Sequence, residues 1–570
     1  MIHARPARLA LPVLLSLTFA VLCATSLLRS SGTWDELHYL GAVGSEAPVV
    51  DAVLQPPLSG WIHGLPLQGL EIPDALRHEP NGPLRGQRIV ALRADDWMLD
   101  SARLALLPLG VALGWIAFAW GRHLYGYGGG LLAMALVCFE PNVVAHAGLI
   151  TPDVTLAATA GFALYQIARL AETPTSQRRV AAGLALGLML LSKHAALLLV
   201  PIFLVTDLAA RLAARAEPRP ALLARAALDW TAIVALALAL LWAGYGFEVG
   251  RVLVGGYEIA VPAPRYVQGA IYQWQQSRLP HDFFLLGQIS QQGWWYFYLV
   301  VALFKVPLGT LLLLALALGA GRWLGIRGRA AELYLVLPAL LLLLYLSFWN
   351  TIQNGFRYLL PVWVPLLVLT GRLALPAARS RAFAVLLGVT LAWSAIATVR
   401  AWPDYLAYVN ELGGGSRNGY RLLSDSNLDW GQGLEALSVW MREHHVPRVQ
   451  LAYFGTADPA HWGIDYLALP SPTSALPQTP PLAPGETPPR VVALSAYQYQ
   501  GVAFHGDNPY ARFHELEPND VVAGSILIFD LDHPRKRSAQ RGEAERSQRS
   551  DPVRRRRNES WPRTVHSPSQ

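Results

Sequence analysis

The amino-acid sequence predicts a polytopic α-helical membrane protein with about eleven transmembrane passes and a small exterior α/β domain toward its C-terminus. The chain has 570 residues, of which 53% are hydrophobic and only 15% are charged. Soluble proteins carry about 25% charged residues, so this composition argues against a fully soluble protein. The apolar residues form blocks long enough to cross a bilayer, and several β-like runs lie beyond residue 400.

Ten apolar blocks predict the membrane spans. The first begins near residue 9 and predicts an uncleaved anchor, because it is longer than the core of a usual signal peptide. The block at 180–206 is interrupted by Ser192, Lys193 and His194, so we expect it to turn back as two short passes. The remaining blocks lie near 104–120, 129–140, 153–168, 226–246, 295–319, 333–349, 358–371 and 383–399.

Arginine residues in short loops predict the orientation, because loops rich in Lys and Arg stay in the cytoplasm. Arginine clusters flank the spans near residues 122, 169–179, 211–225, 322–329 and 372–381. This pattern predicts a cytoplasmic N-terminus and an exterior C-terminal domain. The segments expected outside are 30–102, 141–152, 247–294, 350–357 and everything after 400.

Three regions follow from this organisation. Residues 1–400 form the transmembrane domain, with 30–102 as its first exterior loop, and residues 401–532 form the exterior α/β domain. Residues 533–570 are predicted to be a disordered basic tail. Since residues 535–570 hold 11 Lys or Arg against 4 Asp or Glu, this tail accounts for the net charge of +7. The charge therefore gives no indication of a nucleic-acid surface on the folded body.

Two acidic motifs lie at the exterior edge of the predicted spans. Asp35 and Glu36 follow the first span, and Asp153 opens the span at 153–168. A partly desolvated carboxylate has a raised pKa and can take a proton from a hydroxyl. The alternative is a helix-terminal role without chemistry, since acidic residues are favoured at helix N-termini.

Three cations lie in or beside apolar sequence. Arg357 leads back into the membrane on the same side, and its planar fork can pair two phosphate oxygens. Lys193 is embedded in apolar sequence, where a lone charge is costly and often functional, and Arg103 opens the second predicted span. We predict that these three bind a phosphate, although each could instead reach toward the lipid headgroups.

The exterior domain contains a further polar motif, whose Asp425, Asn427 and Asp429 are candidates for binding an acceptor. Such residues are as often turn and helix-cap groups.

Together these motifs resemble those of the bacterial relatives of the dolichyl-phosphate-mannose protein mannosyltransferases, within the GT-C fold. The resemblance covers most of residues 10–532. Gln55 stands where many relatives have histidine, so a role of that histidine in metal or acceptor binding is not carried over. The matching motifs are Asp35-Glu36, Pro56-Pro57-Leu58, Arg103, Asp153, Phe284–Gly287, Gly293–Tyr296, Arg357–Pro361 and Asp425–Gln432.

The resemblance implies a glycosyltransferase that moves a sugar from a polyprenyl-phosphate carrier to a protein, lipid or glycan acceptor, with inversion, at the non-cytoplasmic face of a bacterial inner membrane. By this resemblance Asp35 is the general base, Glu36 its neighbour in the acidic motif, and Asp153 the second acid. A monophosphate leaving group needs no cofactor. A divalent metal ion held by Asp153 and a histidine is an alternative, and no nucleic acid is expected as a partner.

Two other classes of protein fit the composition. A transporter or lipid flippase would use a similar number of spans, but such proteins place ionisable residues near the membrane midplane. A membrane scaffold with a partner-binding domain would leave the exterior motifs without a common explanation.

Overall fold

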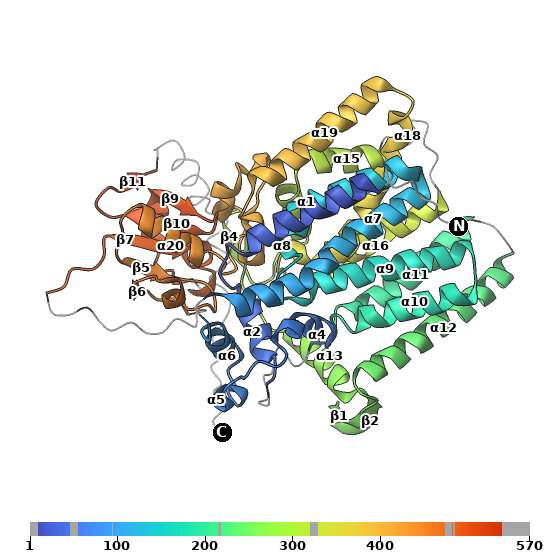
Figure 1. The fold of residues 1–570 in the computed structure, drawn as a ribbon, viewed down its shortest axis with the longest axis horizontal. Helices are drawn as coiled ribbons and strands as arrows, with labels where there is room; N and C mark the ends of the chain where they lie inside the picture. Colours follow the sequence, from blue (N-terminus) through green and yellow to red (C-terminus); the bar gives the residue numbers. More distant parts are fainter. Residues whose placement is uncertain are drawn as a thin grey trace, which may run out of the picture.

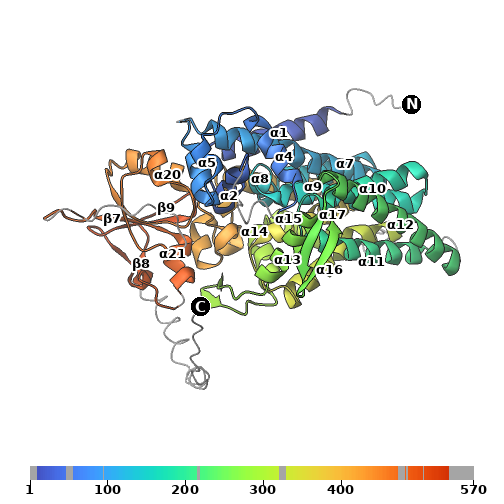
Figure 2. The ribbon, with the colours of Figure 1, turned by 90° about the horizontal axis from the view of Figure 1, so that it is seen from below.

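A computed structural model describes residues 9–45, 55–93, 95–214, 218–319, 329–472, 482, 485–504 and 506–537. A large bundle of apolar helices carries a small domain of strands and short helices at one end (Figures 1 and 2). We call this end of the bundle the domain side. Most of the tail predicted at 533–570 lies outside the described residues.

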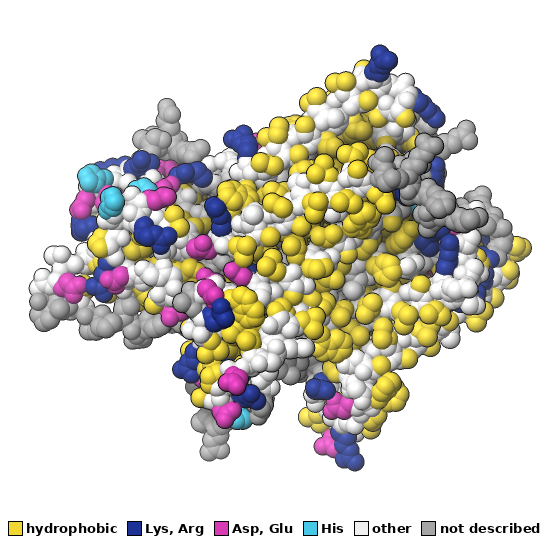
Figure 3. All heavy atoms as spheres, in the orientation of Figure 1, with side chains coloured by type: hydrophobic (Ala, Val, Ile, Leu, Met, Phe, Trp, Pro, Cys, Tyr) yellow, Lys and Arg dark blue, Asp and Glu magenta, His cyan; other side chains and the backbone are white. Residues whose placement is uncertain are grey.

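Eight described helices are long and apolar enough to cross a membrane, and a pair of shorter helices bent by 118° passes the same test together. Hydrophobic side chains cover the visible face of the bundle (Figure 3), as expected for a multi-pass membrane protein. The eight spans are α1 (Ala10–Leu27), α7 (Trp97–Cys138), α9 (Pro152–Glu172), α11 (Ala196–Ala214), α12 (Arg219–Gly244), Ala330–Phe348, which contains α16 (Leu333–Phe348), Leu360–Ala377, which begins with α17 (Leu360–Thr370), and α19 (Arg381–Arg400); the bent pair is α14 (Phe297–Lys305) and α15 (Leu308–Gly319).

The predicted count of eleven passes is not confirmed, because the described helices give eight spans, or nine with the bent pair. The second and third predicted spans both lie within α7. This helix loses helical geometry at Gly126 and folds back there, so that Gly114 packs against Cys138. In addition, α10 (Ser176–Leu190) has 15 residues, fewer than the about 20 that a span needs.

The predicted interruption of the block at 180–206 is present. Helix α10 ends at Leu190 and α11 begins at Ala196, with Ser192, Lys193 and His194 in the turn between them. Helix α10 packs against α9 and α12. Since Lys193 in the turn pairs with Asp153 in the first turn of α9, the turn lies at the domain side of the bundle.

The predicted cytoplasmic arginines gather at the opposite end of the bundle. Arg211 pairs with Asp229 at 3.0 Å, and Arg179 pairs with the same carboxylate at 2.6 Å. Arg372 lies 3.6 Å from Glu332. These residues come from five helices or their flanking turns, so the loops assigned to one side of the membrane do share one end.

Short helices and hairpins cover the domain side. Two of these helices, α2 and α6, cross closely, because a Cβ atom at Gly86 would lie 2.1 Å from the Leu37 carbonyl oxygen. Only glycine permits this contact. The short elements are α2 (Trp34–Ala42), α4 (Leu58–Gly64), α5 (Asp74–Arg77), α6 (Gly82–Val90), α8 (Pro141–His146), α13 (Pro264–Gln276), β1 (Val249–Val254), β2 (Tyr257–Pro262), β3 (Phe283–Leu285) and β4 (Gln288–Ser290). Helix α18 (Ala374–Ala377) lies at the opposite end of the bundle, where it packs against α7 near Gly128.

The C-terminal domain is α/β, as predicted. Its five-stranded sheet has the order β6-β5-β7-β10-β9, in which β5 pairs in parallel with β6 and β7, while the other pairs are antiparallel. Two residues of the predicted tail form β11 and pair with β8. The elements are β5 (Val449–Ala452), β6 (Tyr466–Ala468), β7 (Val491–Ser495), β8 (Leu516–Glu517), β9 (Asp520–Val522), β10 (Ile526–Asp530), β11 (Arg535–Lys536), α20 (Leu434–Glu443) and α21 (Ala496–Gln500).

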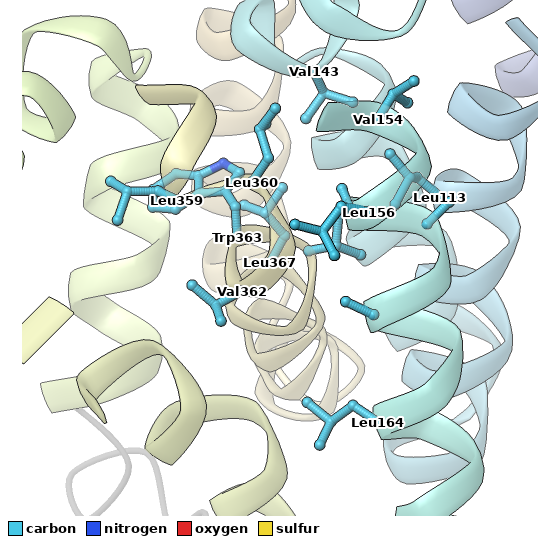
Figure 4. Packing of buried hydrophobic residues seen from close by; sticks show 14 of the residues in the cluster. Leu113, Val143, Val154, Leu156, Leu164, Leu359, Leu360, Val362, Trp363 and Leu367 are labelled. Carbon is cyan, nitrogen blue, oxygen red and sulfur yellow. The ribbon is translucent and has the colours of Figure 1, made fainter. Parts of the chain in front are cut away.

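Two hydrophobic clusters join these parts. In the bundle, Leu360 and Leu367 of α17 point toward Leu156 of α9 (Figure 4). A second cluster combines Leu37 of α2 with residues of the C-terminal sheet such as Ile526. The short helices on the domain side are therefore packed between the bundle and the C-terminal domain.

Candidate active site

Four of the predicted site residues form one charged cluster at the domain side. Arg357 Nη1 donates a hydrogen bond to Asp35 Oδ2 at 2.8 Å and lies 3.7 Å from Asp153 Oδ2. Lys193 Nζ donates to Asp153 Oδ1 at 2.7 Å. We call Asp35, Asp153, Lys193 and Arg357 the charged cluster. It joins four segments that are far apart in the sequence.

Local structure positions each member of the cluster. Asp35 and Asp153 lie in the first turns of α2 and α9, where the positive end of the helix dipole stabilises a carboxylate. Lys193 lies in the turn between α10 and α11, and Arg357 lies in a 3-10 turn (Phe356–Tyr358) before α17. Asp35 and Asp153 therefore have the helix-terminal positions that the sequence left open, and they also belong to the charged cluster.

The members differ in their access to solvent. The Asp35 side chain is 26% exposed, whereas that of Asp153 is 3% exposed. The side chains of Arg357 and Lys193 lie between these values, at 9% and 14%. Burial lowers the pKa of Arg357, but the carboxylates of Asp35 and Asp153 raise it well above its usual value. Arg357 is therefore a permanent cation, and Asp35 is the carboxylate that a molecule from outside reaches first.

Aromatic rings support the two cations. The Arg357 guanidinium lies 4.4 Å from the ring centroid of Trp430 in the C-terminal domain, and Lys193 Nζ lies 5.4 Å from that of Tyr358. Such cation–π contacts are worth about 0.5–2 kcal/mol. Neither ring received a role from the sequence, although both belong to motifs that carry the family resemblance.

Glu36 and Arg103 form a separate, fully buried pair. Arg103 donates to both carboxylate oxygens of Glu36, at 2.8 and 2.6 Å, and its other N–H groups bond the carbonyl oxygens of residues 27, 30 and 31. Glu36 also accepts from the backbone N–H groups of Thr33 and Ile150. Burial raises the pKa of Glu36, but the charge of Arg103 and the hydrogen bonds to Glu36 lower it by more. The pKa of Glu36 therefore lies below its usual value. The structure does not bring this pair into the charged cluster.

The predicted acceptor residues hold the local fold of the C-terminal domain. Asn427 Oδ1 accepts from the backbone N–H of Phe356 at 3.0 Å, and Asp429 Oδ2 accepts from that of Tyr497 at 3.0 Å. Both side chains are buried, whereas Asp425 is partly exposed and interacts electrostatically with Arg357. Burial raises the pKa of Asp429 to about 7. Of the three, only Asp425 remains available to a ligand.

A cavity of about 400 Å³ lies beside the charged cluster. It is lined by residues of α2 and α4 and the chain around them, and by Pro152, which precedes Asp153. Tyr39, one helical turn after Asp35, and His63 both contribute to the wall. The helical period could have placed Tyr39 from the sequence, whereas no motif marks His63.

A metal site finds no support in the described part of the chain. There, no three side chains of His, Cys, Asp or Glu are grouped so that they could hold an ion. Asp153, the predicted ligand, instead pairs with Lys193. The divalent ion stays an untested alternative.

The comparison with protein families finds one match. Residues 90–246 match the model of a family described as dolichyl-phosphate-mannose-protein mannosyltransferase. This stretch contains Arg103, Asp153 and Lys193, and the match confirms the resemblance predicted from the motifs. No curated protein matches the chain.

Several solved structures are similar at low identity. ArnT from Cupriavidus metallidurans, bound to undecaprenyl phosphate, is 14% identical with a TM-score of 0.48, over 92% of this chain and 98% of ArnT. The archaeal oligosaccharyltransferase AglB from Archaeoglobus fulgidus, in complex with an inhibitory peptide and a dolichol-phosphate, is 15% identical with a TM-score of 0.41, over 77% of this chain and 58% of AglB. The arabinofuranosyltransferase AftD from Mycobacteria is 16% identical with a TM-score of 0.38, over 82% of this chain and 33% of AftD.

Proposed function

We propose that this protein is a membrane glycosyltransferase that moves a sugar from a polyprenyl-phosphate carrier to an acceptor, with inversion, at the non-cytoplasmic face of a bacterial inner membrane. The charged cluster carries the proposal. It combines an accessible carboxylate with two cations at one end of a helix bundle, which is where the phosphate of a lipid carrier would stop. The acceptor is a protein, a lipid or a glycan.

In the proposed reaction Asp35 takes the proton of the acceptor hydroxyl as its oxygen attacks the anomeric carbon. The bond from that carbon to the phosphate oxygen breaks, and the polyprenyl phosphate leaves with the electron pair. Arg357 and Lys193 stabilise the charge that develops on the phosphate. Arg357 pairs with Asp35 in the cluster as it stands, so the donor phosphate would compete with the Asp35 carboxylate for this arginine. Donor binding would thus release the base.

The remaining acids and Arg103 have positioning roles in this proposal. Asp153 holds Lys193 through their 2.7 Å ion pair. Glu36 and Arg103 tie the start of α2 to α7 and to the backbone of Ile150. Since every N–H group of Arg103 already has an acceptor, we assign it this role instead of the phosphate contact expected from the sequence.

An apolar hollow of about 430 Å³ between α7 and α9 fits the lipid part of the donor. Its walls include Leu109 and Trp115 of α7 and Ala158 and Phe162 of α9. At a rise of about 1.5 Å per residue, these α9 positions lie roughly 8–14 Å deeper in the bundle than Asp153. A polyprenyl chain could therefore occupy the hollow while its phosphate stays at the cluster.

The test is transfer of radiolabelled sugar from a panel of polyprenyl-phosphate sugars in membranes that contain wild type or Asp35→Asn at matched expression. We expect the variant to lose about 100-fold or more of the wild-type transfer, the scale of general-base catalysis. Asp74→Asn is the matched control, because Asp74 lies on the same loop with its side chain 93% exposed. Near wild-type transfer by folded Asp35→Asn would show that the mechanism is wrong.

The transporter or flippase alternative is separated by the same protein in detergent. Lys193 pairs with the first turn of α9 and so lies near a helix end, not at the midplane where transporters place ionisable residues. We expect purified protein to transfer sugar without any gradient. Lipid movement across vesicles, without transfer from any donor, would favour the alternative.

A further inference from the structure

The β1–β2 hairpin is fixed to the domain-side end of a membrane span. Helix α12 begins at the opposite end of the bundle, where its Asp229 pairs with Arg211, and it ends shortly before β1. Trp242 Nε1 of α12 donates to the Glu248 carbonyl oxygen at 2.9 Å, and the backbone N–H of Ala263, directly after β2, donates to the same oxygen at 2.9 Å. The base of the hairpin therefore stays at the level where α12 ends.

The shape of the hairpin is set by its register and by a tight turn. Two strands of six residues pair antiparallel, with Val254 opposite Tyr257, so that only Gly255 and Gly256 form the turn. Both glycines have positive φ, at 58° and 87°, as a two-residue turn of this hand requires. At about 3.3 Å per residue, the hairpin extends roughly 20 Å from its base.

The two faces of the hairpin differ in chemistry. Side chains alternate along a strand and directly opposite residues share a face, so the register assigns every residue to one face. The face that we call the charged face holds Arg251 and Glu258, whose side chains pair at 3.0 Å. The other, which we call the apolar face, consists of Gly250, Val252, Val254, Tyr257, Ile259 and Val261.

The outer half of the apolar face is exposed. Its base packs against α13, and Val252 there is 2% exposed. Toward the turn, Val254 is 41%, Ile259 46% and Tyr257 76% exposed. Adjacent large apolar side chains that face outward in this way are typical of a surface that contacts a protein or a membrane.

The position of the hairpin favours the membrane. Along the long axis of the molecule the hairpin lies level with the bundle and not with the C-terminal domain (Figures 1 and 2). In Figure 3 the hydrophobic side chains of this lobe face away from the C-terminal domain, whereas its charged side chains lie toward the lower left. Trp242 at the end of α12 and Tyr257 near the turn are both exposed, and these residue types are enriched where a membrane meets water. The apolar face thus continues the lipid-facing surface of the bundle.

We propose that the β1–β2 hairpin docks on the bilayer leaflet at the domain side. Its apolar face lies at the boundary between headgroups and acyl chains, and its charged face lies in water. Because the charges of Arg251 and Glu258 pair with each other, the partner is the apolar part of the lipid and not a headgroup of one charge. This contact adds a membrane attachment to those of the spans, and it does not depend on the proposed catalytic function.

Docking also restrains α13, which follows the hairpin directly. The ring centroid of Tyr266 in α13 lies 4.8 Å from that of His194, the residue after Lys193 of the charged cluster. A hairpin held by lipid therefore anchors a helix that packs against the turn carrying Lys193.

Spin labels on consecutive residues of β2 test the inference in purified full-length protein, in nanodiscs of phosphatidylethanolamine and phosphatidylglycerol. Tyr257→Cys, Glu258→Cys and Ile259→Cys each carry one nitroxide, whose collision rates with oxygen and with a water-soluble nickel complex report its depth. Unsubstituted protein is the labelling control, because Cys23 and Cys138 are both buried. We expect the first and third labels to lie about 5–10 Å into the boundary of headgroups and acyl chains, as other interfacial segments do, and the middle label to stay in water.

Two other results would overturn the inference. If all three labels are equally accessible to the nickel complex, the hairpin projects into water. If the first and third labels are shielded from both reagents, a protein covers the apolar face. Dipolar broadening between labels in nanodiscs that hold two copies would identify that protein as a second copy of this chain.

A carboxylate on either face provides a second check. With the nitroxide at Val254→Cys, the further change Ile259→Asp should move the label toward water, because a carboxylate at the lipid boundary must keep its hydration. Ala260→Asp is the matched control, since Ala260 is the next residue, is exposed and belongs to the charged face. An unchanged depth in folded Ile259→Asp would mean that the label and not the apolar face seeks the lipid, which contradicts the proposal.

Discussion

Arg357 is the residue on which most of the charged cluster depends. It pairs with Asp35, approaches Asp153 and stacks on Trp430, so one planar group contacts three segments of the chain. A lysine would keep the charge but lose the second N–H direction and most of the flat stacking surface. The geometry of the guanidinium therefore matters as well as its charge.

Substitution tests this distinction. Arg357→Lys should retain a measurable fraction of transfer, roughly 1–10% of wild type, and Arg357→Ala should retain less, because each charge-assisted bond is worth about 1.5–3 kcal/mol. Steady-state kcat and donor KM give the comparison. Arg265→Lys on α13 is the control, since that side chain is 58% exposed. Equal activities of Arg357→Lys and wild type would mean that only the charge is used.

Asp429 gives a prediction for pH dependence. Burial raises its pKa to about 7 in the folded protein, above the usual 3.8. The folded state therefore binds the proton more tightly than the unfolded state, and the stability that this group contributes below pH 4 is lost as the pH rises toward 7. Asp429→Asn, which stays neutral, should gain in Tm relative to wild type between pH 5 and pH 8. A constant difference in Tm across that range would contradict the prediction.

At the scale of the elements, the crossing of α2 and α6 fixes the helix that carries Asp35. A Cβ atom at Gly86 would lie 2.1 Å from a backbone oxygen of α2, and backbone cannot rotate away as a side chain can. Gly86→Ala should therefore lower Tm by several degrees and reduce transfer as well, because α2 must shift. Thermal unfolding and transfer assays on the same preparation test this. Gly388→Ala on α19, where no atom lies within 4 Å, should leave both unchanged.

The elements also show what the sequence could predict about the site. Asp35, Asp153, Lys193 and Arg357 were identified because each lies beside an apolar block, and the ends of such blocks meet at a membrane surface. Glu36 could not be separated from Asp35 in this way. Adjacent residues of a helix point about 100° apart, and only the packing of α2 shows that one faces Arg103 and the other the cluster.

Other features depend on contacts between distant segments. The eleven predicted passes are not confirmed by the eight or nine apolar spans among the described residues, and apolar length alone does not reveal that α7 folds back at Gly126 or that α10 is short. The cavity around His63 arises from the packing of α4 against α2 and α9, for which no motif exists. The fold class, by contrast, follows from composition alone, since apolar blocks of this length have few alternatives to a membrane.

At the scale of the whole molecule, the charged cluster is completed by the C-terminal domain. Asn427 bonds the backbone next to Arg357, Ser426 Oγ donates to the Asn354 carbonyl oxygen at 2.7 Å, and Trp430 covers the guanidinium. The domain thus holds the turn that carries Arg357. This arrangement links the folding of residues 401–532 to the chemistry of the bundle.

Trp430→Leu tests this link, because leucine keeps an apolar contact but removes the aromatic face. Loss of a cation–π contact worth about 0.5–2 kcal/mol should lower kcat/KM for the donor by roughly 2- to 30-fold. The change should be absent when Arg357 is already alanine, since the two residues then have no interaction left to lose. Trp274→Leu on α13 is the control, with 57% of that residue exposed. Equal losses in both backgrounds would mean that Trp430 stabilises the domain without acting through Arg357.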